Sequence, residues 1–211
     1  MSQTQILLAT TNPDKQKALR TLLEGLPLSP TTPEQIGLGS PPDEEGDTHL
    51  EVACQKARHW SEEGSTLAIA SDGGLALPAL GTAWESLYTH RFAGEPDDGL
   101  TRVHRLLELM RPYHGEERQA SWVEALAIAH QGRVLVSWEL NGAIGVIAND
   151  PPETLPETSG FWVFSVWEFP ELGKRYNQLS PAELASLDDH WTRLRGLVQR
   201  YFRGYFVTPV A

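Results

Sequence analysis

The sequence predicts an α/β fold with a mixed twisted sheet flanked by helices. Two short apolar runs, 6–9 and 67–70, have the length and composition of buried strands, and helical patterns separate them. Two further segments, 120–130 and 133–140, flank a turn that contains glycine, which is typical of an antiparallel hairpin. A chain of 211 residues is long enough to bury a sizeable core. This length suits one large domain or two small ones.

The first half of the chain alternates helical patterns with these strands. A helix is predicted directly after the first strand. Residues 27–43 hold five of the 15 prolines and predict a loop or an irregular edge. Apolar residues at helical spacing predict a second helix over 48–63 and a third over about 98–111. The apolar face of the first helix consists of Leu19, Leu22, Leu23 and Leu26.

The C-terminal third is less regular. Residues 149–159 are rich in proline, acidic residues and threonine, and they predict an exposed loop. The apolar run 161–167 predicts a strand. Ser180 followed by Pro181 marks the start of a helix, and the last helix is expected to reach about Phe202.

Charge and cysteine content exclude several classes of function. The net charge of −11 and a pI near 5 argue against a nucleic-acid partner bound through a basic face. The single Cys54 excludes an intramolecular disulfide and a thiolate metal cluster, so we expect a buried, inert thiol. The sequence shows neither a leader pattern nor a run of 18 apolar residues. We expect a cytoplasmic protein with no membrane partner.

The end of the first strand has the composition of an anion site. The strand stops at Thr10, Thr11 and Asn12, and Lys15 follows one turn into the helix. The N–H groups at a helix start attract negative charge, and Thr10, Asn12 and Lys15 add polar and cationic donors. The alternative is a capped helix with a surface lysine.

Two carboxylate segments are candidates for chemistry. Asp72 follows the apolar run 67–70 and precedes two glycines, which would let a ligand approach the backbone. Glu44 lies in an acidic loop before the helix that carries Lys56, and clustered carboxylates suit Mg²⁺. The alternatives are a tight turn at Asp72, a solvated acidic loop and a surface lysine.

The last helix region carries further candidates. His190 lies near several arginines, which form either a phosphate-facing edge or a solvated helix face. Three tryptophans in this third could stack on a nucleobase or pack in the core. They are Trp162, Trp167 and Trp191.

These motifs, taken in order, resemble the inosine triphosphate pyrophosphatase family, which hydrolyses nucleoside triphosphates to monophosphate and pyrophosphate. The similarity spans roughly residues 5–200. The matching segments are 8–15, 44–57, 70–75, 88–94 and 174–180.

The resemblance implies a single ITPase-like domain over 1–211, with two lobes around an elongated central cleft. It implies a nucleoside triphosphate substrate, such as ITP, XTP or dITP, and Mg²⁺ as cofactor. The triphosphate is assigned to Thr10, Asn12 and Lys15, and Mg²⁺ to Glu44. Asp72 is assigned to metal binding or water activation, so that Asp72 and Lys15 are the catalytic candidates. The phosphate charge is assigned to Lys56 and Arg91, and the base pocket to Phe161 and His190.

Departures from the family pattern leave alternatives open. Ser71 stands where the family has the first of two aspartates, and Phe164 stands where an aspartate reads the base. Trp191 replaces the arginine of the last motif. The chain could therefore be a catalytically impaired nucleotide-binding homologue or a pyrophosphatase with a changed substrate. The family also implies a homodimer. Trp84, Tyr88 and Phe92 lie in a stretch with few charges, which is the composition of an interface, and the alternative is that these rings pack in their own domain.

Overall fold

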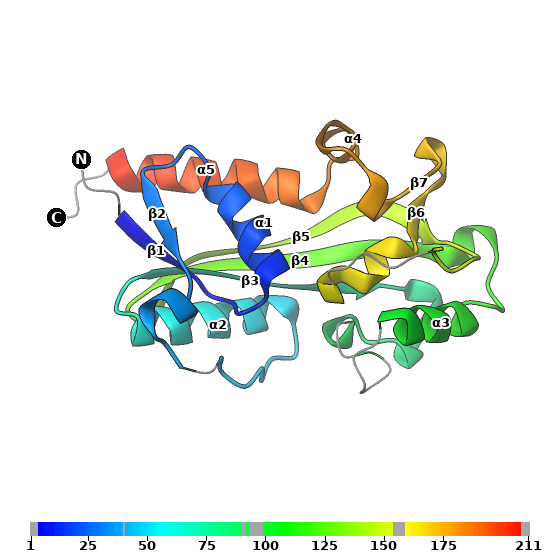
Figure 1. Ribbon diagram of the computed structural model, residues 1–211, viewed down its shortest axis with the longest axis horizontal. Coiled ribbons are helices and arrows are strands. Elements are labelled where there is room, and N and C mark those ends of the chain that lie inside the picture. The colour runs from blue at the N-terminus through cyan, green and yellow to red at the C-terminus, as the bar shows by residue number, and fades with distance from the viewer. Residues whose placement is uncertain (1–3, 40, 90–91, 93–98, 154–158, 208–211) are drawn as a thin grey trace. The chain divides into compact units, whose positions relative to one another are not determined.

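The computed structural model describes residues 4–39, 41–89, 92, 99–153 and 159–207, and it confirms the mixed α/β fold (Figure 1). A seven-stranded sheet has the order β2-β1-β3-β4-β5-β6-β7. The chain divides into two compact units. Unit 1 consists of Met1–Asp72, Glu124–Leu140 and His190–Ala211, and unit 2 of Gly73–Val123 and Asn141–Asp189.

The regular elements have the following bounds. The strands are β1 Thr4–Leu8, β2 Leu28–Thr31, β3 Leu67–Ala76, β4 Gln119–His130, β5 Arg133–Ile147, β6 Trp167–Phe169 and β7 Lys174–Arg175. The helices are α1 Pro13–Leu23, α2 His49–Glu63, α3 Gly99–Leu109, α4 Pro181–Ser186 and α5 His190–Val207. Among the described residues, no helix is both long and apolar enough to span a membrane.

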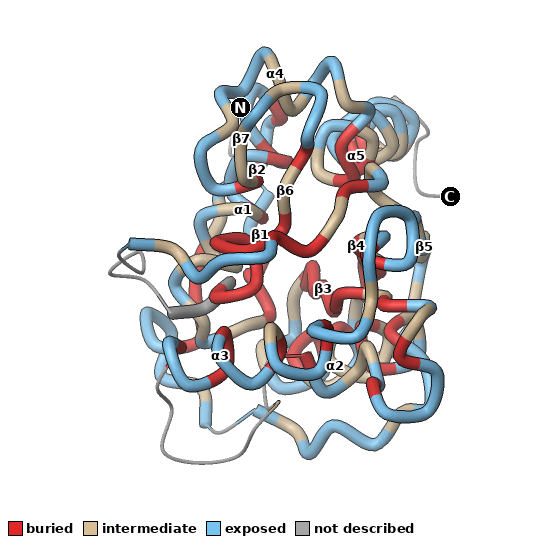
Figure 2. The backbone as a smooth tube through the Cα atoms, turned by 90° about the vertical axis from the view of Figure 1, so that its right-hand side faces the viewer, coloured by how far each residue is buried: buried red, intermediate tan, exposed pale blue. Residues whose placement is uncertain are grey.

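Side-chain size alternates along the strands of unit 1 and separates its two cores. Large aliphatic side chains of β1, β3 and β4 pack with α1 and α5, which also pack against each other. The residues that alternate with these aliphatic side chains along the strands are mostly alanines, and they pack with α2. Because an alanine side chain occupies little volume above the sheet, α2 lies close to the strands. β3 is buried along nearly its whole length (Figure 2).

Residues 27–43 contain the irregular edge that was one of the two alternatives for this segment. The short strand β2 pairs in parallel with β1 and tolerates Pro30 because it lies at the sheet edge. Two other predictions were wrong. The strand predicted at 67–70 continues as β3 to Ala76. The run predicted as a strand at 161–167 is mainly the 3₁₀ segment Ser159–Ser165, since short apolar runs do not distinguish the two structures.

The aromatic side chains of unit 2 form its core. Trp84 is 7% exposed, and its Nε1–H donates to the carbonyl of Leu75 at 2.6 Å. Trp162 is also buried and donates to the carbonyl of Thr89 at 3.1 Å. The predicted interface role of Trp84 is therefore wrong, and for Trp162 the structure shows the core packing that was one of its two alternatives. Only Tyr88 of the expected interface is exposed.

Gly74 has a packing function rather than the ligand-approach function expected from the sequence. A Cβ atom at this position would lie 2.0 Å from the carbonyl oxygen of Ser86. The glycine therefore makes room for the chain's own backbone.

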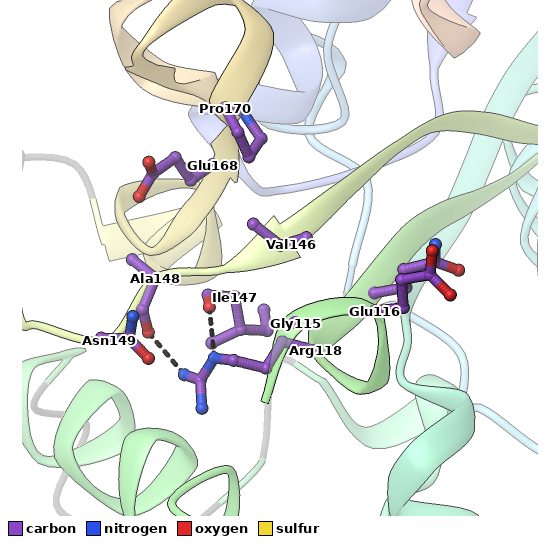
Figure 3. A pocket seen from close by; sticks show the side chains of 10 residues that line it. Gly115, Glu116, Arg118, Val146, Ile147, Ala148, Asn149, Glu168 and Pro170 are labelled. Carbon is purple, nitrogen blue, oxygen red and sulfur yellow. Dashed lines mark hydrogen bonds between the residues drawn. The ribbon is translucent and has the colours of Figure 1, made fainter. Parts of the chain in front are cut away.

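A pocket of about 440 Å³ in unit 2 lies beside Arg118 (Figure 3). The guanidinium donates to the carbonyls of Ile147 at 2.7 Å and Ala148 at 2.6 Å. Further bonds reach the carbonyls of Met110 and Tyr113. Arg118 thus ties backbone segments together, and these bonds use four of its five N–H donors.

Glu183 caps α4 and gives a pH-dependent prediction. Hydrogen bonds from Lys174 and Ser180 lower the pKa of Glu183 to about 2. Its ionised form therefore stabilises the fold above the unfolded pKa of about 4.3, and this contribution is lost as the pH falls toward 2. We expect Glu183→Gln to lower Tm by about 1–3 °C at pH 7 and to have a smaller effect near pH 2. Thermal melts should show no such trend for Glu171→Gln, which changes an exposed carboxylate outside this cap.

Candidate active site

The strand pattern of unit 1 places Asp72 on the face covered by α2. Ala68 and Ala70 pack in the α2 core, and Asp72 follows two residues later on the same face of β3. His49 and Lys56 come from α2, on the helix face that also carries the buried Ala53. The site therefore joins one buried strand to the N-terminal half of one helix.

Both carboxylate oxygens of Asp72 have partners. His49 Nδ1 lies 2.6 Å from Oδ2, while Lys56 Nζ lies 2.9 Å from Oδ1. Lys15 Nζ approaches the same Oδ1 at 4.0 Å. The side chains of Asp72, Lys56 and His49 are about nine-tenths buried. Low solvent exposure strengthens these interactions relative to a surface pair.

The ionisation of the cluster follows from these contacts. Burial raises the pKa of Asp72, but the hydrogen bond from His49 and the charges of Lys15 and Lys56 hold it well below its usual value. Burial lowers the pKa of Lys56, but Asp72 and Glu44 raise it further, so that the net shift is upward. The carboxylate and the ammonium are both charged at neutral pH.

Glu44 reaches the cluster through Lys56. Its Oε1 lies 2.6 Å from Lys56 Nζ, so Glu44 and Asp72 contact the same ammonium. Two carboxylates that converge on one cation suit Mg²⁺, which usually takes one or two carboxylates and completes its shell with water and phosphate oxygens. No group of three or more His, Cys, Asp or Glu residues in the described part of the chain could hold a metal. Glu44 and Asp72 therefore suit a metal ion that binds together with the phosphates of a nucleotide.

The loop that carries Glu44 is tied to the start of α2. Thr48 and Glu51 form a capping box, in which the Glu51 carboxylate accepts from the N–H groups of Asp47 and Thr48. Gly46 packs so closely that a Cβ atom there would lie 2.8 Å from Val52 Cγ2 and 3.0 Å from the backbone nitrogen of Val52.

Gly46→Ala should therefore move this loop and Glu44 away from α2. We expect a loss of about 1–3 kcal/mol in the free energy of unfolding and several-fold weaker Mg²⁺ binding in the presence of nucleotide. Denaturant unfolding and calorimetry measure the two effects. Gly39→Ala is the matched control, because nothing lies within 4 Å of its added Cβ. Equal behaviour of the two variants would contradict this role of Gly46.

The start of α1 differs from the sequence interpretation in one respect. Asn12 is the N-cap, and its Oδ1 accepts from the N–H groups of Asp14 at 2.9 Å and Lys15 at 3.2 Å. The first-turn N–H groups expected to bind an anion are therefore used by the cap. An anion at this end would meet the Asn12 amide, the Thr10 hydroxyl and the Lys15 ammonium instead.

The remaining predicted residues are not brought into this cluster by the described structure. Arg91 and the side chain of Phe161 lie outside the part of the chain that the structure describes. His190 begins α5 and is fully buried. Ser71, which replaces an aspartate of the family pattern, is buried on the opposite face of β3 from Asp72. Its hydroxyl has no hydrogen-bond partner among the described residues.

His49 is the site residue that the sequence interpretation missed. The predicted apolar face of the second helix included Ala53 and Ala57, and His49 lies one turn before Ala53. A histidine that extends a buried helix face is a signal for a buried polar contact. Its partner could not be named without the strand alternation that brings Asp72 to this face.

Comparisons with known sequences identify relatives of this chain. The sequence model of the Ham1 family matches residues 6–185. A dITP/XTP pyrophosphatase of Thermus thermophilus is 33% identical over 201 residues, which are 95% of this chain and 93% of the relative. A dITP/XTP pyrophosphatase of Escherichia coli is 29% identical over 201 residues, which are 95% of this chain and 99% of the relative.

Solved structures share the fold. A HAM1 protein from Coxiella burnetii superposes with a TM-score of 0.77 at 23% identity, covering 95% of this chain and 99% of that one. The Ham1 protein of Staphylococcus aureus gives a TM-score of 0.74 at 22% identity, with coverage of 95% and 99%. The mixed sheet and its helices are therefore the architecture of these proteins.

Proposed function

The chain belongs to the Ham1 family, and from this premise we propose that it hydrolyses nucleoside triphosphates to monophosphate and pyrophosphate. We propose deaminated purine nucleotides such as ITP, dITP and XTP as substrates, in line with the names of its relatives. The observation that carries the proposal is the cluster in which Glu44 and Asp72 share Lys56 beside Lys15.

The reaction requires positive charge on the triphosphate. The oxygen of a water molecule attacks the α-phosphorus, and the bond from this phosphorus to the bridging oxygen breaks. Pyrophosphate leaves with the bonding electrons, and the attacking water gives up a proton. Lys15 and Lys56 supply two positive charges, but Glu44 and Asp72 balance them. We propose that bound Mg²⁺ supplies the missing positive charge on the phosphates and that Glu44 and Asp72 hold it.

We assign Asp72 to charge and metal binding rather than to proton abstraction. A carboxylate whose pKa is well below its usual value is a weak proton acceptor at neutral pH. In the same proposal, Thr10 and Asn12 donate to phosphate oxygens at the start of α1. Arg91 adds a cation to the triphosphate.

The base is proposed to contact Phe161 and His190 with loose hydrogen-bond readout. Phe164 stands where the family has a base-reading aspartate, and it packs in the unit 2 core with Trp122 and Tyr176. An apolar pocket discriminates by only about 10–200-fold, whereas a hydrogen-bonding site discriminates far more strongly. We therefore propose that inosine triphosphate is preferred over adenosine triphosphate by less than about a thousandfold.

The decisive experiment measures pyrophosphate release from a panel of nucleoside triphosphates with and without Mg²⁺. The proposal expects one pyrophosphate for each monophosphate, the fastest turnover with a deaminated purine nucleotide, and no turnover in EDTA. Turnover of a different nucleotide alone would show a changed substrate. Tight nucleotide binding without any pyrophosphate would show the impaired homologue that the loss of an aspartate at Ser71 suggests.

We further propose a cytoplasmic homodimer. Light scattering should then give about twice the chain mass of 23.4 kDa. Tyr88 is the exposed aromatic residue of the expected interface, with 52% of its surface accessible. A monomeric mass at micromolar concentration would contradict the dimer.

A further inference from the structure

We infer that His49 is a positioning residue for the proposed reaction, because it fixes the orientation of the Asp72 carboxylate. The inference rests on the proposed function and adds a residue to which the sequence analysis assigned no role. It starts from one contact, in which His49 Nδ1 lies 2.6 Å from Asp72 Oδ2.

The pair is built from two rigid elements. His49 is the first residue of α2, directly after the Thr48 cap, and it is 5% exposed. Asp72 lies within β3 and is 7% exposed. Ala53 and Ala70 pack between the same helix and strand. Neither backbone can move away from the other without disturbing this core, so the distance between the two side chains is set by the fold.

The direction of the hydrogen bond follows from charge. The Asp72 carboxylate is ionised and can only accept, so the hydrogen lies on His49 Nδ1. A histidine that donates to an ionised carboxylate restricts its rotation. This bond occupies Oδ2 and leaves Oδ1 toward Lys56 and Lys15, the cations on the proposed triphosphate side.

The role that we infer for His49 depends on this difference between the two carboxylate oxygens of Asp72. Oδ1 is the atom that shares Lys56 with Glu44, so it is the oxygen placed for a cation or a phosphate-bound metal. Without the bond to Oδ2, the carboxylate could turn and present either oxygen to the lysines. Second-layer partners of this kind usually change activity or metal affinity by about 10–100-fold.

Two variants distinguish the hydrogen bond that His49 donates from the packing of its ring. His49→Phe keeps a ring but removes the donor, and we expect kcat to fall about 10–100-fold with KM changed less than about threefold. His49→Asn places an amide donor near the position of Nδ1 and should retain kcat within about fivefold. His59→Phe makes the same change on the partly exposed side of α2 and controls for effects on the helix. Unchanged kcat in folded His49→Phe, or equal losses in the two His49 variants, would overturn the inference.

A double-mutant cycle tests whether His49 acts through Asp72. In the Asp72→Asn background, His49→Phe should change kcat by less than about threefold, because the group that it orients is already altered. If the fold-losses in kcat of the two single variants multiply in the double variant, the inference is overturned.

Two measurements remain informative if the wild-type enzyme proves inactive, an outcome that would refute the proposed function alone. Long-range ¹H–¹⁵N spectra should show a hydrogen on Nδ1 of His49, and an Nδ1 without hydrogen would overturn the inference. Calorimetry with a non-hydrolysable triphosphate analogue should show Mg²⁺ binding about tenfold weaker in His49→Phe than in the wild type. Equal affinity of these two proteins for Mg²⁺ would count against a positioning role.

Discussion

Asp72→Asn should lower kcat by roughly 100-fold or more. The amide has nearly the size of the carboxylate but no negative charge. It can therefore no longer balance Lys56 and Lys15, whose ammonium groups lie 2.9 and 4.0 Å from Oδ1. It is also a much weaker ligand for Mg²⁺. Pyrophosphate release at saturating nucleotide and Mg²⁺ measures the effect.

The control makes the same chemical change at a carboxylate on α2, outside the cluster. Glu63→Gln also converts a carboxylate to an amide, at the C-terminal end of α2, where its partner is His59. This variant should retain wild-type kcat. Circular dichroism and thermal melts show whether each variant is folded. A folded Asp72→Asn variant with full activity would contradict the assignment of Asp72.

Much of unit 1 could be predicted because its residue pattern is local. The runs at 6–9 and 67–70, the helix at 48–63 and the hairpin across 130–133 all correspond to observed elements. Their cores differ in a way that the sequence already contains, since large aliphatic residues and alanines alternate along β3 and β4.

The sequence was least informative where contacts with neighbouring segments determine the structure. The prolines of 27–43 left a loop and an irregular edge open, and the parallel pairing with β1 makes this segment the edge strand β2. Asp72 and Gly74 carry turn signals, yet both lie inside β3, where Ser86 approaches Gly74. Tertiary contacts therefore outweigh local turn propensity here.

The sequence predicted which residues form most of the candidate site, but not which of them contact each other. Lys15, Glu44, Lys56 and Asp72 were expected to act on one ligand, and the structure joins them through contacts in which both lysines approach Asp72 and Glu44 contacts Lys56. The sequence could not show that Lys56 lies between the two carboxylates, because that depends on how the loop before α2 closes at Gly46. It also could not pair His49 with Asp72, which are 23 residues apart.

Lys56→Met should affect metal and nucleotide in opposite directions. The ammonium lies 2.6 Å from Glu44 Oε1 and 2.9 Å from Asp72 Oδ1, so it occupies the space where both carboxylates could bind a cation. Removing it frees these oxygens, and we expect nucleotide-free protein to bind Mg²⁺ about tenfold or more tightly. The triphosphate loses a cation, and kcat/KM should fall by roughly 100-fold or more.

The free energy of unfolding and Tm provide an independent measurement of the role of Lys56. Loss of one partner from a buried ion pair costs about 3–5 kcal/mol when the other charge is left uncompensated. His49 and Lys15 still contact Asp72 in this variant, so we expect a loss below about 3 kcal/mol. Because a metal that binds only the folded state raises Tm, Mg²⁺ should raise the Tm of Lys56→Met more than that of the wild type.

Lys17→Met is the matched control, because it removes an exposed ammonium from α1 outside the cluster. It should leave Mg²⁺ affinity, kcat/KM and the response of Tm to Mg²⁺ at wild-type values. Calorimetry without nucleotide, steady-state kinetics and melts with and without Mg²⁺ provide the three comparisons. Weaker Mg²⁺ binding by nucleotide-free Lys56→Met would mean that Glu44 and Asp72 do not form a shared cation site, because removal of a competing ammonium can only favour a metal bound between them.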